Sequence, residues 1–299
     1  MRNFFSNKNK EFGTLFTFPV VVSLIIILIV VGSALFAPLI APYNPDKLEL
    51  SQSLQQPSFE HLLGTDKTGR DLFSRMLFGT QTTLISSLGV VLISFIIGVP
   101  LGLYSGYYSG LIDSIIMRTE DIILAFPALL LAFIFVAGFG RGIGNAVLAL
   151  GIVYVPMISR LTRSLTLTEK TKTYVESAQS IGYSNIRILF RHILPNCIST
   201  LVAQLTLDIG YAILDLAALS FLGLGVQPPT SDWGAMLEEG RIFLQTNPLL
   251  ALAPGIAIII TVVSFNVLSD GVQMYLDPSQ RKLPKFKKLK KMAGEQNGW

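Results

Sequence analysis

The chain of 299 residues is poor in charge, in histidine and in cysteine. Its single cysteine, Cys197, excludes an internal disulfide framework and a cysteine-based zinc site, and we expect it to be a small buried apolar residue. Only 14% of the residues are charged, against roughly 25% in a soluble domain. With 51% hydrophobic residues and a mean hydropathy of +0.57, most of the surface is expected to meet something other than water.

Long runs without charge are abundant, and they predict membrane spans. A helix needs about 20 mostly apolar residues to cross the hydrocarbon core. The six predicted spans are residues 17–39, 82–104, 122–140, 142–159, 199–222 and 249–268. The first is too long for a cleaved signal peptide and is expected to be a retained anchor. Gly102, Gly106 and Gly110 are assigned to the turn after the second span. The predicted fold class is all-α integral membrane.

Lys and Arg are unevenly distributed over the connections between these spans. With the N-terminus inside, the inner segments hold 17 of them and the outer segments hold 6. Four of the outer six lie in residues 40–80, and the other two are Arg141 and Arg241. Since basic residues favour the cytoplasmic side, both termini are predicted to be cytoplasmic.

The connection between the fourth and fifth spans, residues 160–198, is predicted to be folded. Thr173 and Glu176 have the spacing of a capping box, which begins a helix. Gly182 is suited to end that helix in the left-handed conformation, and Ser184 to cap a second helix. Apolar residues are expected on these helices, away from lipid: Tyr174, Val175, Ala178, Ile181, Ile188 and Leu189. Such a surface implies a partner protein.

Within this connection, Glu176-Ser177-Ala178, Gly182 and His192-Ile193-Leu194-Pro195 resemble the cytoplasmic "EAA" loop of ABC-importer permeases. Ser177 replaces the first alanine of the pattern, and His192 replaces an isoleucine. The resemblance implies a coupling helix that docks into a groove on an ATPase subunit. It assigns the ATPase contact to Glu176, Ser177, Ala178, Gly182, Leu194 and Pro195. We expect Glu176 to pair with a basic group or to cap the helix, and Gly182 to set the bend.

Two further stretches resemble the peptide and nickel branch of that family, the "C" type. They are Leu63-Gly64-Thr65-Asp66 with Gly69-Arg70-Asp71 and Ser74-Arg75, and Leu219 to Gly225 with Pro228-Pro229 and Trp233-Gly234. The resemblance implies a multi-pass protein of the bacterial inner membrane. It would pair with a homologous permease around a central path, with two ATP-binding subunits and an extracytoplasmic binding protein. We expect a first segment with one span (1–81), a permease core (82–278) and a basic cytoplasmic tail (279–299).

No group of residues in the sequence predicts catalysis, a cofactor or a metal. Gly64 to Arg70 has the spacing of half a phosphate-binding loop, but the Lys and Ser or Thr that such a loop needs are missing. ATP hydrolysis is therefore expected on separate subunits. His61 and His192 are predicted on opposite sides of the membrane, too far apart to share a metal. The tail from Arg281 to Lys291 suits anionic lipid headgroups, and nothing predicts nucleic-acid binding.

Asp208 and Asp215 lie seven residues apart in the fifth span, and hence on one helix face. Intramembrane carboxylates are costly unless they face water or the bundle interior. Two interpretations stay open: they line the translocation path and favour cationic cargo, or they form hydrogen bonds with neighbouring helices.

The cargo and the transport class each have an alternative. Short peptides are the default cargo of the branch, but Asp208-Ile209-Gly210 is closer to nickel-type members, so nickel or a metal chelate stays open. The alternative to an ABC permease is a self-sufficient secondary transporter. It would be expected to show internal repeats, and we find none.

Overall fold

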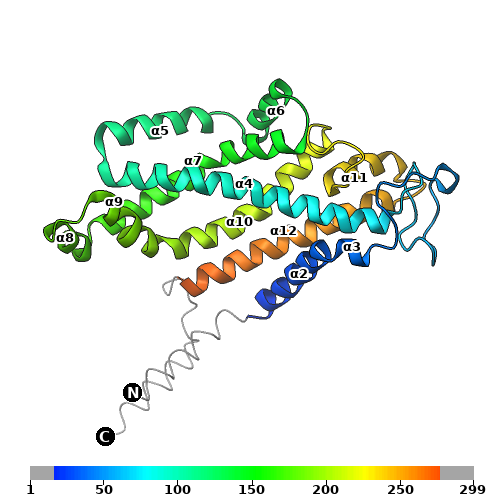
Figure 1. The fold of residues 1–299 in the computed structure, drawn as a ribbon, viewed down its shortest axis with the longest axis horizontal. Coiled ribbons are helices and arrows are strands. Elements are labelled where there is room, and N and C mark those ends of the chain that lie inside the picture. Colours follow the sequence, from blue (N-terminus) through cyan, green and yellow to red (C-terminus); the bar gives the residue numbers. More distant parts are fainter. Residues whose placement is uncertain (1–16, 277–299) are drawn as a thin grey trace, which may run out of the picture.

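The computed structural model describes residues 17–276, and these residues form helices and connections without a strand (Figure 1). The elements are α2 (Phe18–Leu35), α3 (Ala37–Ile40), η1 (Leu50–Gln52), α4 (Leu72–Tyr108), α5 (Gly110–Leu124), α6 (Ala128–Phe139), α7 (Ile143–Lys170), α8 (Thr173–Ser180), α9 (Asn185–Ile188), η2 (Leu189–Ile193), α10 (Leu194–Phe221), α11 (Trp233–Gly240), η3 (Arg241–Phe243) and α12 (Leu249–Leu276). The basic N-terminal residues and the basic tail lie outside the described residues.

Five helices in the described part are long and apolar enough to cross a membrane. They contain α2, α4, α7, α10 and α12, and the bent pair α5 and α6 makes up to six spans. The prediction of an all-α membrane protein is confirmed.

The third predicted span, residues 122–140, is not one continuous helix. α5 ends at Leu124, α6 begins at Ala128, and the two are bent by 86°. Pro127 lies between them, and a proline disfavours the helical conformation in the residue before it. The predicted third span is therefore divided into two helices, which together count as one bent span.

The turn predicted at Gly102 and Gly106 is also wrong, because both lie inside α4. The turn comes at Ser109 and Gly110, whose φ angles are +56° and +67°. A Cβ on Gly102 would lie 2.3 Å from the Ser159 carbonyl oxygen, and one on Gly106 would lie 2.8 Å from the Arg163 carbonyl oxygen. These glycines allow α4 and α7 to touch backbone to backbone, as small residues four apart do in membrane helices.

Two other helices are longer than predicted. α7 continues to Lys170, past the predicted end at residue 159, and α10 begins at Leu194 rather than at residue 199. η2, a π-helical turn, joins α9 to α10. Pro195 lies in the first turn of α10, where a proline is tolerated. The predicted boundary between residues 81 and 82 falls inside α4, and the division into segments stays a prediction.

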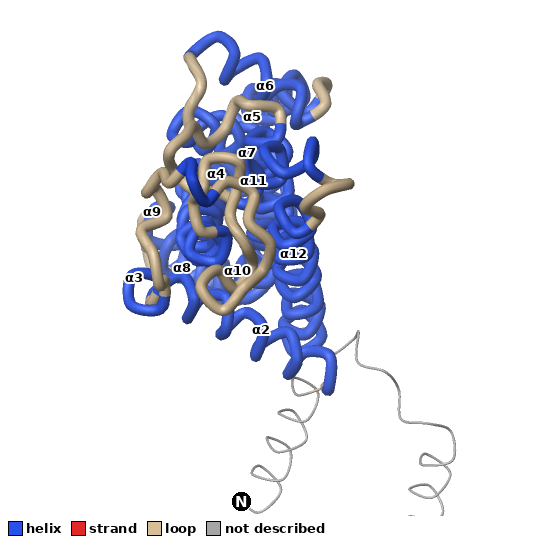
Figure 2. Tube along the Cα trace, turned by 90° about the vertical axis from the view of Figure 1, so that its right-hand side faces the viewer, coloured by secondary structure: helices blue, strands red, loops and turns tan. Residues whose placement is uncertain are grey.

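The long helices leave two distinct ends, shown in Figure 1. α8 and α9 lie at one, which we call the α8–α9 end. α11 and the connection between α3 and α4 lie at the other, the α11 end, and Figure 2 shows the loops there in front of the helices. Cys197 is 1% exposed in the apolar cluster at the α8–α9 end, which confirms its predicted burial.

Candidate functional site

The end of α8 has the local geometry expected from the sequence. Gly182 has a φ of +86°. Its backbone N–H donates to the Gln179 carbonyl at 2.9 Å, and the Tyr183 N–H donates to the Ala178 carbonyl at 3.1 Å. These two bonds form a Schellman motif, which ends a helix at a left-handed residue. The predicted role of Gly182 as the residue that ends the helix is confirmed.

The start of α8 differs from the predicted capping box. Lys172 is the N-cap residue, Thr173 already lies in the helix, and no side chain caps the free backbone N–H groups. Glu169, in the last turn of α7, pairs with the Lys172 ammonium at 2.5 Å and accepts a hydrogen bond from the Tyr174 hydroxyl at 2.7 Å. These two contacts bind the first turn of α8 to the end of α7, so the helix begins without the Thr173 cap.

The apolar face of this connection is turned mostly toward its own bundle. Val175, Ala178, Ile188 and Leu189 are at most 5% exposed, in a cluster with Leu103 of α4 and other residues. The prediction that these side chains lack burial within the chain was wrong. Other apolar groups remain on the surface, namely Ile181 (71% exposed), Ile186 (59%), Phe190 (43%) and Tyr183 (37%).

Tyr107, near the end of α4, joins the connection to the bundle. Its hydroxyl donates to the Asn185 carboxamide oxygen at 3.0 Å and accepts from the Gln179 amide at 3.1 Å. The Lys170 ammonium donates to the Tyr107 carbonyl. One residue thus contacts α7, α8 and the start of α9. Sequence reasoning missed it, and a tyrosine at the polar end of a long apolar run was the available signal.

The six residues that the resemblance assigned to the ATPase contact fall into two groups. Glu176, Ser177, Gly182 and Pro195 are exposed, whereas Ala178 is buried and Leu194 is partly buried. Within residues 17–276 the Glu176 carboxylate has neither an ion pair nor a hydrogen bond, so its expected pairing is not made inside this part of the chain. Ala178, facing inward, positions α8 and does not offer a contact surface.

The two carboxylates of α10 have different surroundings. Asp208 is 2% exposed; one oxygen accepts from the Gln204 amide at 2.8 Å, and the other has no hydrogen-bond partner among the described residues. Asp215 is half-buried and accepts from the Tyr154 hydroxyl of α7 at 2.7 Å. Asp208 is thus enclosed by its own chain in this conformation, whereas Asp215 remains partly accessible.

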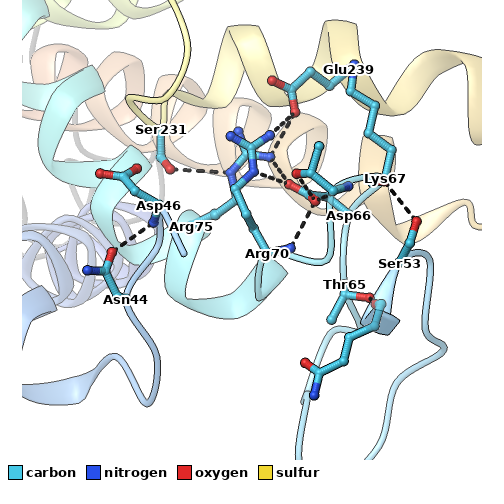
Figure 3. Close-up of polar contacts among 12 residues, drawn as sticks. Asn44, Asp46, Ser53, Thr65, Asp66, Lys67, Arg70, Arg75, Ser231 and Glu239 are labelled. Atoms are coloured by element: carbon cyan, nitrogen blue, oxygen red, sulfur yellow. Dashed lines mark hydrogen bonds and ion pairs between the residues drawn. The ribbon is translucent and has the colours of Figure 1, made fainter. Parts of the chain in front are cut away.

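At the α11 end, a buried network of ion pairs joins three elements (Figure 3). The Arg75 guanidinium contacts Asp66 at 2.6 Å and Glu239 at 2.8 Å, and Arg70 contacts the same two carboxylates at 2.7 and 3.0 Å. The four side chains are between 2% and 13% exposed. Two cations and two anions therefore balance in a site with little water, and they tie the loop before α4, the first turn of α4 and α11 together.

Asp66 also explains why the half phosphate-loop spacing has no phosphate site. One of its carboxylate oxygens accepts from the Thr68 N–H and hydroxyl, both at 2.7 Å, and from the Arg70 N–H at 3.0 Å. The backbone donors of this turn are thus taken by the chain itself. Burial alone raises the pKa of Asp66, but the Arg75 charge, the Thr68 hydrogen bond and the Arg70 charge outweigh it and hold that pKa below its usual 3.8.

The glycines of this segment are required by close packing. Gly64 and Gly69 have φ angles of +82° and +77°. A Cβ on Gly69 would lie 1.9 Å from the Glu49 carbonyl oxygen, and one on Gly64 would lie 2.4 Å from that of Gln55. Both left-handed geometry and space exclude other residues here.

Helix capping explains two further aspartates at this end, Asp71 and Asp232. Asp71 caps α4 by accepting from the Ser74 N–H at 2.7 Å, and contacts His61 Nδ1 at 2.9 Å. Asp232 caps α11, accepting from the N–H groups of Gly234 and Ala235 at 3.0 and 3.1 Å. The sequence pattern at this end therefore sets the starts of α4 and α11, next to the ion-pair network that joins them.

Comparisons with known proteins agree with this architecture. A family model described as the inner membrane component of binding-protein-dependent transport systems matches residues 98–282. A second, the N-terminal TM domain of oligopeptide transport permease C, matches residues 19–57. The solved MetNI methionine ABC transporter, in an inward facing conformation, is similar in fold, with a TM-score of 0.55 and 17% identity over 68% of this chain and 96% of that chain.

Curated relatives match over most of their length. The glutathione transport system permease protein GsiD of Pectobacterium atrosepticum is 44% identical over 253 residues, 84% of each chain. GsiD of Escherichia coli O157:H7 is 47% identical over 255 residues, 85% of this chain and 84% of its own. The chain therefore belongs to the inner-membrane permeases of binding-protein-dependent ABC importers, in the peptide and nickel class.

Proposed function

We propose that this permease imports short peptides such as glutathione, and that it works with a homologous permease, two ATP-binding subunits and an extracytoplasmic binding protein. Identity of 44–47% to glutathione permeases across most of the chain is the observation on which this proposal rests. It favours peptide over nickel as cargo. ATP hydrolysis takes place on the separate subunits, and this chain converts their closure into movement of its helices.

The α8–α9 end is the docking surface for an ATPase subunit, and it faces the cytoplasm. Support comes from the exposed Ile181 and Ile186, which flank the Gly182 turn and have no apolar cover within the described chain. The exposed Glu176 lies on the same short helix and is available for a basic group of the partner. The bonds from Tyr107 stiffen the attachment, so displacement of α8 is passed to α4.

A cytoplasmic α8–α9 end places both termini in the cytoplasm and the α11 end outside. The excess of Lys and Arg in the inner segments supports this orientation. Reporter fusions at residues 299 and 60 should then indicate opposite compartments. Equal reporter signals at both positions would contradict the orientation.

In the path, Asp215 is the carboxylate that meets cargo, because it is partly accessible and Asp208 is enclosed. Asp208 acts through packing in the conformation described, and reaches the path only if α10 moves. Of the two interpretations made from the sequence, path lining thus applies to Asp215 and packing applies to Asp208.

The function is tested by uptake into proteoliposomes that contain the complete complex, with the binding protein and labelled glutathione, dialanine or Ni²⁺ in separate arms. Saturable glutathione or dialanine uptake that requires both internal ATP and the binding protein supports the proposal. Uptake of Ni²⁺ without uptake of either peptide would contradict the peptide assignment. Ile181→Asp should uncouple uptake by weakening ATPase docking, with Lys47→Gln at the opposite end as the control.

A further inference from the structure

Two arginines 100 positions apart in the sequence line the same cavity at the α11 end. Arg141 lies in the turn between α6 and α7, and Arg241 opens η3. Each is the only basic residue of its connection. The cavity has a volume of about 410 Å³, within the range of small-molecule sites.

Some of the charged side chains around this cavity already have ion-pair partners, and one does not. Arg241 pairs with Glu238 at 3.4 Å and lies over the Phe221 ring at 5.4 Å. Glu239 is held by the two arginines of the buried network. Arg141 makes no ion pair or hydrogen bond through its side chain in the described part of the chain, so its guanidinium is the cation available to a ligand.

Hydrogen bonds hold the two segments that carry Arg141 and the residues after α10. The Gly142 N–H donates to the Leu224 carbonyl at 3.1 Å, which joins the Arg141 turn to the segment after α10. The Asn145 amide donates to the Gly140 carbonyl at 2.8 Å, and the Gln227 amide to the Gly223 carbonyl at 3.2 Å. A site that is already formed loses little conformational entropy when it binds.

We propose that this cavity binds a short zwitterionic peptide on the outer side of the permease, before the path. Arg141 takes a carboxylate in a two-point contact, and Glu238 receives the ammonium group on Oε2, because Arg241 contacts only its Oε1. Phe221 and Leu222 offer apolar surface to the peptide side chains between these two charges. Opposite charges across one cavity match the two charged ends of a peptide. This inference rests on the proposed peptide transport.

The test measures peptide binding to the complete complex in nanodiscs without the binding protein, by saturation-transfer NMR. The probes are glutathione, its diethyl ester, in which both carboxylates are blocked, and dialanine. Arg141→Gln should weaken glutathione and dialanine about tenfold, the contribution of a charge-assisted hydrogen bond in a partly hydrated site. Binding of the ester should change less than twofold, and Arg141→Lys should be intermediate. Lys47→Gln, which removes a charge at the same end outside the cavity, should leave all three affinities unchanged.

Selective loss for the free carboxylates supports the site. Absence of saturable binding of both peptides to the wild-type complex would overturn it. So would an Arg141→Gln complex that loses equal affinity for glutathione and its ester, or that keeps the wild-type affinity for both peptides. In a separate measurement with the binding protein present, an Arg141→Gln complex that binds peptides normally but binds that protein more weakly would assign Arg141 to docking and also overturn the inference. Uptake by the wild-type complex is measured separately, so the transport proposal can survive when the cavity proposal fails.

Discussion

Replacement of Gly102 by alanine tests the contact on which the α4–α7 pair is built. The added Cβ would lie 2.3 Å from the Ser159 carbonyl oxygen, 2.6 Å from the Thr162 Cβ and 2.9 Å from the Arg163 nitrogen. Ordinary contacts begin near 3.4 Å, so the two helices must separate by about 1 Å at this point. Two of the three neighbours are backbone atoms, which no rotamer change can move.

The cost of Gly102→Ala follows from two opposing effects. Overpacking of a tight contact costs about 1–3 kcal/mol, and a backbone collision belongs at the upper end. Alanine recovers about 1 kcal/mol of helix propensity. The expected net loss is about 2 kcal/mol. The matched control is Gly32→Ala in α2, where nothing lies within 4 Å of the added Cβ, so a gain of about 1 kcal/mol is expected.

Thermal unfolding of the purified permease complex in one detergent measures this difference. Gly102→Ala should lower the midpoint by several degrees, whereas Gly32→Ala should leave it unchanged or raise it slightly. Gly102→Ala with a midpoint equal to that of Gly32→Ala would refute the close packing of α4 on α7.

Four other perturbations have defined outcomes. Gly182→Val should abolish uptake while membrane insertion persists, because a branched residue is strained at a φ of +86°; normal uptake would contradict the bend. Arg75→Gln should cost about 3–5 kcal/mol in unfolding free energy by leaving two buried carboxylates underpaired, against less than about 0.5 for the exposed Arg118→Gln. The pKa of Asp66 is lower in the folded than in the unfolded protein, so its contribution to the free energy of unfolding is complete above about pH 4 and is lost as the pH falls further. Titration of Asp66 should therefore not lower the thermal unfolding midpoint between pH 7 and pH 5. The Asp215→Asn permease should assemble normally and take up cationic peptides less well, with a smaller loss for neutral ones. If uptake of both kinds of peptide falls by the same factor or not at all, Asp215 is assigned to packing.

The sequence predicted the helices well because the length of an apolar run directly reflects the thickness of the membrane. It predicted their ends poorly, because α4 and α7 continue beyond the apolar run as polar helices. The 86° bend at Pro127 was missed since the residues around it are uniformly apolar. The four-residue spacing of Gly98, Gly102 and Gly106 is typical of a helix-packing face. A glycine by itself also favours a turn, so the sequence alone did not decide between the two.

The candidate sites show the same division between local and distant interactions. The left-handed Gly182 was predictable, since its conformation depends on the residue itself. The capping box at Thr173 failed because Glu169, on the preceding helix, binds the residues on either side of it. The contact between Arg75 and Glu239 spans 164 positions, and a pattern confined to one segment holds no information about such a pair.

α4 connects the two ends of the permease physically. At 1.5 Å per residue, a helix of 37 residues is about 55 Å long, which exceeds the thickness of a bilayer including its headgroups. Its first turn holds Arg75 in the ion-pair network at the α11 end, and its last turn holds Tyr107 against α8 and α9. Between these points Gly98, Gly102 and Gly106 bring its backbone close to α7. A continuous packed route therefore joins α8 to α11, whereas α5 and α6 are interrupted by the 86° bend at Pro127.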